Sequence, residues 1–161
     1  MTGAGVPRDQ EEAERWLHVA AEAGDLNSQV DLAHQLLEGA NLPGERPPVA
    51  DWFRRTAAGG DLVAAFNLGV CLLKGVGIEK DEQQAAVWLR RAAEGVAEAQ
   101  YMLGRLLSEG RGISADPKAA REWFARAAEA GVTDSQVALA EMFINEGGGA
   151  VFRRDWTAPH V

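Results

Sequence analysis

The chain has 161 residues, 47% of them hydrophobic, with a formal net charge of −8 and a pI near 4.9. This length and composition suit one domain with a continuous core. The charge disfavours nucleic acid and anionic membrane surfaces as partners, because phosphate binding needs a basic face and no large cluster of Lys and Arg is present. No apolar run approaches the ~20 residues that span a bilayer, so membrane insertion is not expected.

One segment recurs along the chain. Residues 3–24 read GAGVPRDQEEAERWLHVAAEAG, residues 75–95 read GVGIEKDEQQAAVWLRRAAEG, and residues 110–131 read GRGISADPKAAREWFARAAEAG. Residues 39–60 are a divergent copy that keeps its tryptophan. The tryptophans are 36, 36 and 35 residues apart, at Trp16, Trp52, Trp88 and Trp123. Such a fixed period predicts stacked pairs of helices whose core is a continuous ribbon.

The first helix is predicted over about Gln10 to Ala23. Asp9 precedes it and corresponds to Asp81 and Asp116 in later copies, where an Asp can accept hydrogen bonds from the first free N–H groups of a helix. Gly24 is expected to end the helix in a left-handed turn. Because the tryptophans recur in every copy at helical spacing with small alanines, all four are predicted to be core residues. The carboxylates at helix starts are interpreted as solvated charges that suit the helix dipole, namely Glu11, Glu12, Glu14, Asp81 and Glu82.

A second helix is predicted over about Asn27 to Glu38, and three later segments resemble it. Its equivalent core positions are Leu32, Leu68, Leu103 and Leu139, then Leu36, Leu72, Leu106 and Phe143. The residue after the first leucine is always small: Ala33, Gly69, Gly104 and Ala140. A glycine inside a helix costs roughly 1 kcal/mol relative to alanine. This pattern therefore predicts that another helix crosses closely at that position.

The chain after the third glycine loop completes the last unit. Its final helix is predicted over about Ser135 to Glu146, which places a repeat domain at residues 3–147 and a glycine-rich break with a tail at residues 148–161. Two readings of the tail stay open: Phe152 and Trp156 cover the apolar end of the stack, or the tail is disordered. The irregular loop at residues 40–48 is interpreted as a repeat turn that has diverged, since the phase on either side is unbroken.

The recurring string resembles the Sel-one-like (Sel1-like) repeat, SLR, a relative of the tetratricopeptide repeat (TPR). The best copy lies between residues 64 and 93, with Leu68, Gly69, Gly75, Gly77, Ile78, Asp81, Ala85, Trp88, Leu89, Ala92 and Ala93. The copy that begins at Ala99 is nearly as complete, whereas the divergent unit departs at Asn41, Glu45 and Val49. Copies in phase cover about residues 3–147.

The resemblance implies an all-α fold, an α/α superhelix or solenoid of about four SLR helix pairs and about eight helices. In this family the first helix of each pair lines the concave surface, where protein segments bind. The chain begins with a second helix of the family's unit. If Met1 is the native start, we expect a cytoplasmic protein. If a further part of the chain precedes Met1, the localisation stays open.

The sequence predicts no catalytic, cofactor or metal site. The histidines, His18, His34 and His160, are not accompanied by the convergent groups that catalysis needs, and too few ligand types are present for zinc. The single cysteine, Cys71, lies in an apolar run and is interpreted as a small buried hydrophobe. The Gly-x-Gly turns follow helices and lack the Lys-Ser/Thr of phosphate loops, so they are interpreted as ordinary turns.

A binding face is predicted instead on the helices that line the concave surface. Its residues are Val30, His34 and Leu37; Phe66, Val70 and Leu73; Tyr101, Arg105 and Ser108; and Val137, Glu141 and Ile144. A helix that is apolar all round is either buried on every side or presents an interaction surface. Burial between adjacent units stays open for Phe66 and Tyr101, and the favoured contacts are Val70, Leu73, Arg105 and Glu141.

These observations favour a non-catalytic scaffold or adaptor that binds a peptide or protein segment on its concave face. The alternative is a regulatory or assembly module of a longer bacterial envelope or signalling protein. Self-association into a homo-oligomer is compatible with either, because an open helix face can be covered by a second copy. An enzyme is disfavoured by the lack of a convergent site.

Overall fold

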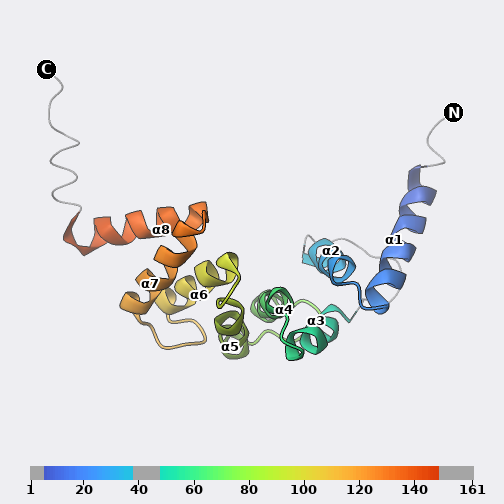
Figure 1. Ribbon diagram of the computed structural model, residues 1–161, viewed down its shortest axis with the longest axis horizontal. Coiled ribbons are helices and arrows are strands. Elements are labelled where there is room, and N and C mark those ends of the chain that lie inside the picture. The colour runs from blue at the N-terminus through green and yellow to red at the C-terminus, as the bar shows by residue number, and fades with distance from the viewer. Residues whose placement is uncertain (1–5, 38–47, 149–161) are drawn as a thin grey trace, which may run out of the picture.

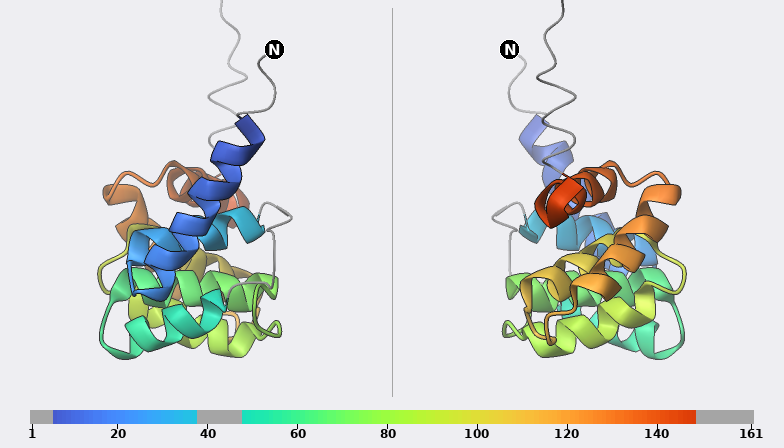
Figure 2. Two further views of the ribbon diagram at one scale, coloured as in Figure 1. Left: turned by 90° about the vertical axis from the view of Figure 1, so that its right-hand side faces the viewer. Right: turned by 90° about the vertical axis from the view of Figure 1, so that its left-hand side faces the viewer.

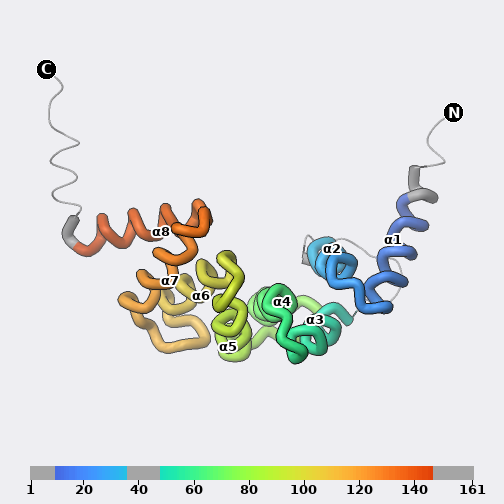
Figure 3. Tube along the Cα trace, viewed as in Figure 1, coloured from blue at the N-terminus to red at the C-terminus, as the bar shows by residue number. Residues whose placement is uncertain are grey.

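The computed structural model describes residues 6–37 and 48–148, and the regular secondary structure of this part of the chain is all helical, without strands. The helices are α1 (Val6–Glu22), α2 (Leu26–Leu37), α3 (Val49–Ala58), α4 (Leu62–Lys74), α5 (Glu82–Ala92), α6 (Ala97–Glu109), α7 (Pro117–Glu129), α8 (Thr133–Phe143) and the π-helical turn η1 (Ile144–Gly148). They stack in chain order into a crescent (Figure 1), and Figure 3 traces the same path from α1 to α8. The predicted α/α solenoid is confirmed.

The helices form an inner and an outer layer. Helices α2, α4, α6 and α8 line the inner side of the crescent, and α1, α3, α5 and α7 lie on its outer side (Figure 1). Viewed along the crescent, successive pairs overlap closely (Figure 2). The most extensive packing joins α4 to α5 and α6 to α7. Helices α4 and α6 therefore each form a tight hairpin with the outer helix that follows, whereas α2 packs mainly on α1 and α8 mainly on α7.

Helix starts follow the sequence closely in the regular repeats. The Asp81 carboxylate accepts hydrogen bonds from the N–H groups of Gln83 and Gln84 at 3.1 and 3.0 Å, and Asp116 accepts one from Ala119 at 3.1 Å. Both predicted caps are confirmed. The prediction for Asp9 is wrong, because α1 begins at Val6 and Asp9 lies inside it. No described helix precedes α1, so no neighbour forces a turn there, and Pro7 is tolerated in a first helical turn.

The last helix differs from its prediction at both ends. Helix α8 begins at Thr133 and ends at Phe143, and the chain continues through Gly148 as the π-helical turn η1. The predicted end at about Glu146 is therefore wrong, since the helical path runs into the glycines. Residues 38–47 and 149–161, including Phe152 and Trp156, lie outside the described residues.

The small residues of α4 and α6 each receive a bulky side chain from the next outer helix. A Cβ at Gly69 would lie 2.8 Å from Cγ of Leu89, and one at Gly104 would lie 2.7 Å from the Phe124 ring. The partner follows the small residue by 20 positions in both cases. The predicted close crossing is confirmed, and it explains why glycine replaces alanine inside these helices.

The core lies between the two layers and thins toward the ends. Leu32, Leu68, Leu72, Leu103 and Leu106 are buried as predicted, and Leu139 is half-buried against the cluster. Of the tryptophans, Trp52 is buried, and Trp88 and Trp123 are half-buried against the core.

Two core predictions are wrong, both at the ends of the stack. Trp16 on α1 is 64% exposed, and Phe143 on α8 is 65% exposed. Each residue belongs to an end helix of the stack, and the described residues hold no further helix pair beyond it. The repeat pattern marks these positions as core because it assumes neighbours on both sides.

The glycine loops dock each hairpin onto the preceding one. Gly112 has φ of +69° and approaches the Glu82 carbonyl so closely that a Cβ would collide with it. A Cβ at Gly77 would instead lie 3.2 Å from Cγ2 of Val49, a tight contact without a collision. Beside Gly112, the Arg111 guanidinium binds the Glu82 carboxylate at 2.6 Å. The interpretation of Glu82 as a solvated charge is therefore wrong: it forms a partly buried ion pair between adjacent repeats, and the bond from Arg111 lowers the pKa of that carboxyl.

A recurring glutamine joins three of the described inner helices, α2, α6 and α8, to the outer helix before each of them. The side-chain amide of Gln29 donates to the carbonyl of Ala21 at 3.0 Å, and Gln100 donates to Ala93 at 3.0 Å. Gln136 donates to Ala128 at 3.3 Å. These carbonyls lie at the C-terminal ends of the outer helices, and those of Ala21 and Ala128 also accept the backbone N–H of Gly24 and Gly131. The sequence signal, a Gln one helical turn into three inner helices, was present but was not interpreted.

Candidate partner-binding face

The predicted binding residues on the inner layer differ in how far they reach solvent. Val30, Phe66, Leu73 and Tyr101 are half-buried and pack against the core, and Val70 is also half-buried. His34, Arg105, Ser108, Val137, Glu141 and Ile144 are exposed. The side chain of Leu37 lies outside the described residues. The exposed part of this face therefore lies mainly on α6 and α8.

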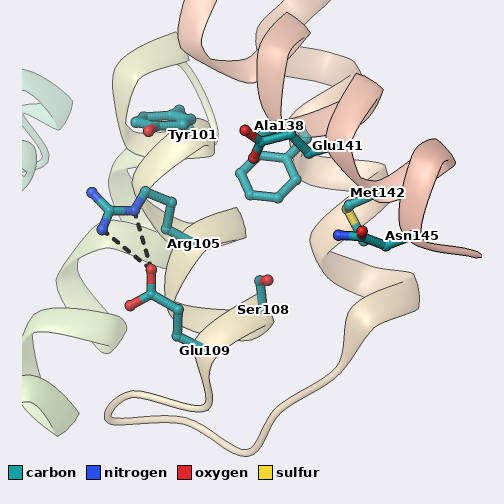
Figure 4. Close-up of a pocket in the computed structure, with 9 residues that line it drawn as sticks. Tyr101, Arg105, Ser108, Glu109, Ala138, Glu141, Met142 and Asn145 are labelled. Carbon is teal, nitrogen blue, oxygen red and sulfur yellow. Dashed lines mark hydrogen bonds and ion pairs between the residues drawn. The ribbon is translucent and has the colours of Figure 1, made fainter.

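Four of these predicted residues meet in one pocket between α6 and α8. Tyr101, Arg105, Ser108 and Glu141 line a cavity of ≈ 230 Å³, as Figure 4 shows. Its other lining residues, which sequence reasoning missed, are Glu109, Phe124, Ala138, Met142 and Asn145. We call this cavity the inner pocket. It gives the candidate face a concave element that a plain apolar stripe lacks.

The wall of the inner pocket on α6 carries a chain of ion pairs. Arg105 donates from Nε and Nη2 to one oxygen of Glu109, at 3.3 and 3.2 Å. The other oxygen of Glu109 accepts from Arg111 at 3.3 Å, and Arg111 also binds Glu82. These bonds raise the pKa of Arg111 and keep both guanidiniums compensated. The network thus links the pocket wall to the joint between two repeats.

The wall on α8 carries an uncompensated charge. Glu141 is exposed and forms no ion pair with any described residue. Figure 4 shows its carboxylate turned toward α6, whereas the Arg105 guanidinium is turned toward Glu109. Asn145 adds an amide at the same rim. The two walls of the pocket therefore differ: one has its charges paired, and the other presents a free carboxylate.

The floor of the inner pocket is aromatic and apolar. The rings of Tyr101 and Phe124 lie with centroids 5.9 Å apart at 44°, a tilted arrangement that favours aromatic contact. Ala138 and Met142 line the α8 side. Ala138, Glu141, Met142 and Asn145 follow one another at spacings of three, one and three residues on a helical face, so the sequence could have grouped them. Phe124 could not be found that way, because it comes from an outer helix.

A second, shallower pocket lies on the outer layer. It is lined by Val87, Trp88, Arg90 and Arg91 of α5 and by Glu94 just after that helix, and its volume is ≈ 330 Å³. The Arg91 guanidinium lies 5.7 Å from the Trp88 ring centroid, and Arg126 lies 4.8 Å from Trp123 one repeat later. This repeated stacking covers the half-buried tryptophans, so a structural role explains these residues.

No alternative chemistry gathers elsewhere in the described residues. Cys71 is buried in α4, and burial raises the pKa of its thiol to about 11. Residues 6–37 and 48–148 hold no group of three His, Cys, Asp or Glu side chains able to bind a metal ion. Among the described helices, none has both the length and the hydropathy to cross a membrane.

The paired helices and the glycine loops define an α/α solenoid, and the inner pocket lies on its concave side. The pattern of the Sel1 repeat family matches residues 1–25, 62–95 and 97–132, more than half of the chain. The chain belongs to the Sel1 repeat family. Proteins of this family generally act as scaffolds for protein interactions.

Solved structures agree with this assignment. A Sel1 repeat protein from Oxalobacter formigenes is 35% identical with a TM-score of 0.62, over 78% of this chain and 95% of that one. The Escherichia coli protein c5321, a protective antigen with an SLR fold, is 32% identical with a TM-score of 0.69, over 82% of this chain and 28% of that one. The Helicobacter pylori cysteine-rich protein B shares the fold at 20% identity, with a TM-score of 0.62 over 85% and 99% of the two chains. No curated protein matches the chain.

Proposed function

We propose that this protein is a non-catalytic scaffold that binds a segment of another protein on the inner face of its crescent. The observation that carries the proposal is the inner pocket, where residues from two neighbouring inner helices converge on a concave, partly aromatic surface. Concave sites with an apolar floor and a few polar groups at the rim are typical of recognition sites. A segment lying across α4, α6 and α8 can contact this pocket and the half-buried Val70 and Leu73 together.

A variant that fills the inner pocket tests this proposal. Ser108 is exposed at the rim, so Ser108→Trp places an indole in the cavity without disturbing the core. The probe is a displayed library of random dodecapeptides selected on the wild-type protein. Binding of the selected peptides is expected to fall at least about tenfold in Ser108→Trp, since the pocket residues no longer reach the peptide.

The matched control is Glu122→Trp, which adds the same side chain at an exposed position of the outer helix α7. This variant is expected to bind the selected peptides like the wild type. Peptides that bind the wild type and both variants equally would show that the inner pocket is not the recognition site. Peptides that lose binding only to Glu122→Trp would show the same.

Self-association is a second candidate function, favoured by the two open ends of the stack. Trp16 and Val19 are exposed on α1, and at the other end Phe143 of α8 and Ile144 of η1 are exposed. Exposed large apolar side chains at both ends suit head-to-tail contact between copies, in which the interface joins unlike surfaces. The match to part of the larger c5321 protein also fits an assembly module of a longer protein.

Light scattering over a concentration series separates these two functions. A constant molar mass near 17.2 kDa identifies a monomer and leaves the inner face as the binding surface. A mass that rises with concentration, and falls back in Trp16→Glu, identifies assembly through the ends.

A further inference from the structure

We infer that the inner pocket selects a Lys or Arg side chain of the bound segment, and that Glu141 is the residue that recognises its positive charge. This inference rests on the proposed function, because it specifies one contact of a segment on the inner face. It assigns a chemical class to the partner at this position and a specificity-determining role to one residue.

The charges that line the inner pocket favour a cation. Arg105, Glu109 and Glu141 are the charged residues of its wall, so the lining carries a net charge of −1. Arg105 is held by Glu109, whose second oxygen binds Arg111. Glu141 forms no ion pair with a described residue, and its carboxylate is turned across the pocket (Figure 4). An incoming ammonium or guanidinium supplies the missing counter-charge and forms a charge-assisted hydrogen bond.

The floor of the pocket suits the remainder of such a side chain. Lys and Arg carry an aliphatic stem that packs on apolar surface while the charged end stays polar. Tyr101, Phe124 and Met142 supply that surface next to Glu141. The half-buried Tyr101 ring also attracts a cation, with Arg the more frequent partner, whereas Phe124 is 3% exposed and contributes apolar surface only. A basic side chain can therefore satisfy the floor and the wall of the pocket at once.

An acidic side chain fits the same pocket poorly. An acid that reaches the remaining N–H groups of Arg105 meets a guanidinium whose charge Glu109 already neutralises, and it then lies near Glu141, which has no ion-pair partner among the described residues. Like charges that are brought together without compensation disfavour a complex. A purely apolar side chain leaves Glu141 desolvated beside it, which also weakens binding.

Selection from the displayed library of random dodecapeptides tests this inference directly. Peptides enriched on the wild-type protein are expected to share a Lys or Arg at one position. Replacing an enriched Arg with citrulline, which keeps the shape and removes the charge, is expected to weaken binding about tenfold. The variant Glu141→Gln is expected to weaken the Arg peptide by a similar factor and to abolish the difference between Arg and citrulline.

Two further variants sharpen the test. Glu129→Gln removes a carboxylate from the exposed last turn of α7, outside the pocket, and is expected to retain the preference for Arg over citrulline. Glu141→Lys reverses the charge of the wall and is expected to select peptides with an acidic residue at the position that was basic.

The outcomes separate this inference from the proposed function. Two results would overturn the role of Glu141 and leave the inner face as the binding surface. In the first, the peptides lose binding to Ser108→Trp but share no basic position. In the second, the peptides bind Glu141→Gln as tightly as the wild type. An equal loss in Glu129→Gln and Glu141→Gln also overturns it, because the effect is then one of overall charge. Peptides that ignore Ser108→Trp overturn the proposed function itself.

Discussion

At the scale of single residues, Gly104 shows how little space the two layers leave. A Cβ there would lie 2.7 Å from two atoms of the Phe124 ring, which is 3% exposed and held on its other side by Tyr101. We expect Gly104→Ala to lower the free energy of unfolding by about 1–2 kcal/mol, because overpacking outweighs the gain in helix propensity of roughly 1 kcal/mol. Chemical denaturation measures the change.

A double-mutant cycle identifies the cause of that loss. In a Phe124→Leu background the ring is absent, so Gly104→Ala should cost little or become stabilising. The same loss in both backgrounds would contradict the close approach of Gly104 and Phe124 as its cause.

Because Cys71 is buried, its contribution to the free energy of unfolding depends on pH. The thiol is 1% exposed, and its pKa is raised from 9.0 to about 11. Because the unfolded chain loses this proton first, the contribution is complete below pH ~9 and is lost as the pH rises toward ~11. We expect the free energy of unfolding of the wild type to fall by about 2–3 kcal/mol relative to that of Cys71→Ala over this range. Urea unfolding of both proteins at several pH values measures the difference, and a constant difference would contradict a buried thiol.

At the scale of elements, the glycine loops decide how one hairpin docks on another. Gly112 and Gly131 both have positive φ, at +69° and +95°, but only Gly112 has a neighbour within reach of a Cβ. Both Ala variants incur the strain of a left-handed residue, roughly 1 kcal/mol. We expect Gly112→Ala to cost at least about 1–2 kcal/mol more than Gly131→Ala, since the added methyl meets backbone that must move. Thermal unfolding of the two variants compares them, and equal losses would show that the loop does not fix the docking.

The elements also show what the sequence could predict. Features that depend on local residue spacing could be predicted, and a repeat presents each such pattern more than once. These features are the helix pairs, the helix caps Asp81 and Asp116, and the close approach at Gly104. The predicted start of α1 is wrong because Asp9 has the position of a capping Asp in the repeat, but no described helix precedes α1 to force a turn there. The contact between Arg111 and Glu82 was missed because it joins residues 29 positions apart.

The inner pocket was predictable only in part, for a similar reason. Helical spacing placed Tyr101, Arg105 and Ser108 on one face of α6 and Glu141 on one face of α8. Whether two such faces form a cavity depends on how adjacent repeats are inclined to each other, which no local pattern specifies. Phe124 enters the pocket from the outer layer, through the gap that Gly104 leaves.

At the scale of the whole molecule, stability is expected to fall from the middle of the crescent to its ends. A solenoid gains stability from each repeat and from the contact between neighbours. Helices α4 to α7 have packed neighbours on both sides, whereas α1 packs mainly on α2, and α8 mainly on α7 and η1. The exposed Trp16 and Phe143 mark the ends where one neighbour is lacking.

Hydrogen exchange measured by mass spectrometry tests this gradient. Amides of α4 to α7 are expected to exchange slowest, and those of α1 and α8 fastest, because local opening at an end breaks fewer contacts. Leu103→Ala removes a fully buried side chain from α6 and is expected to lower stability by about 2–4 kcal/mol. Its effect on exchange should be largest in α5 to α7 and smallest in α1. Equal acceleration in every helix would mean that the crescent unfolds as one cooperative unit, and then the inner pocket would be as rigid as the centre of the stack.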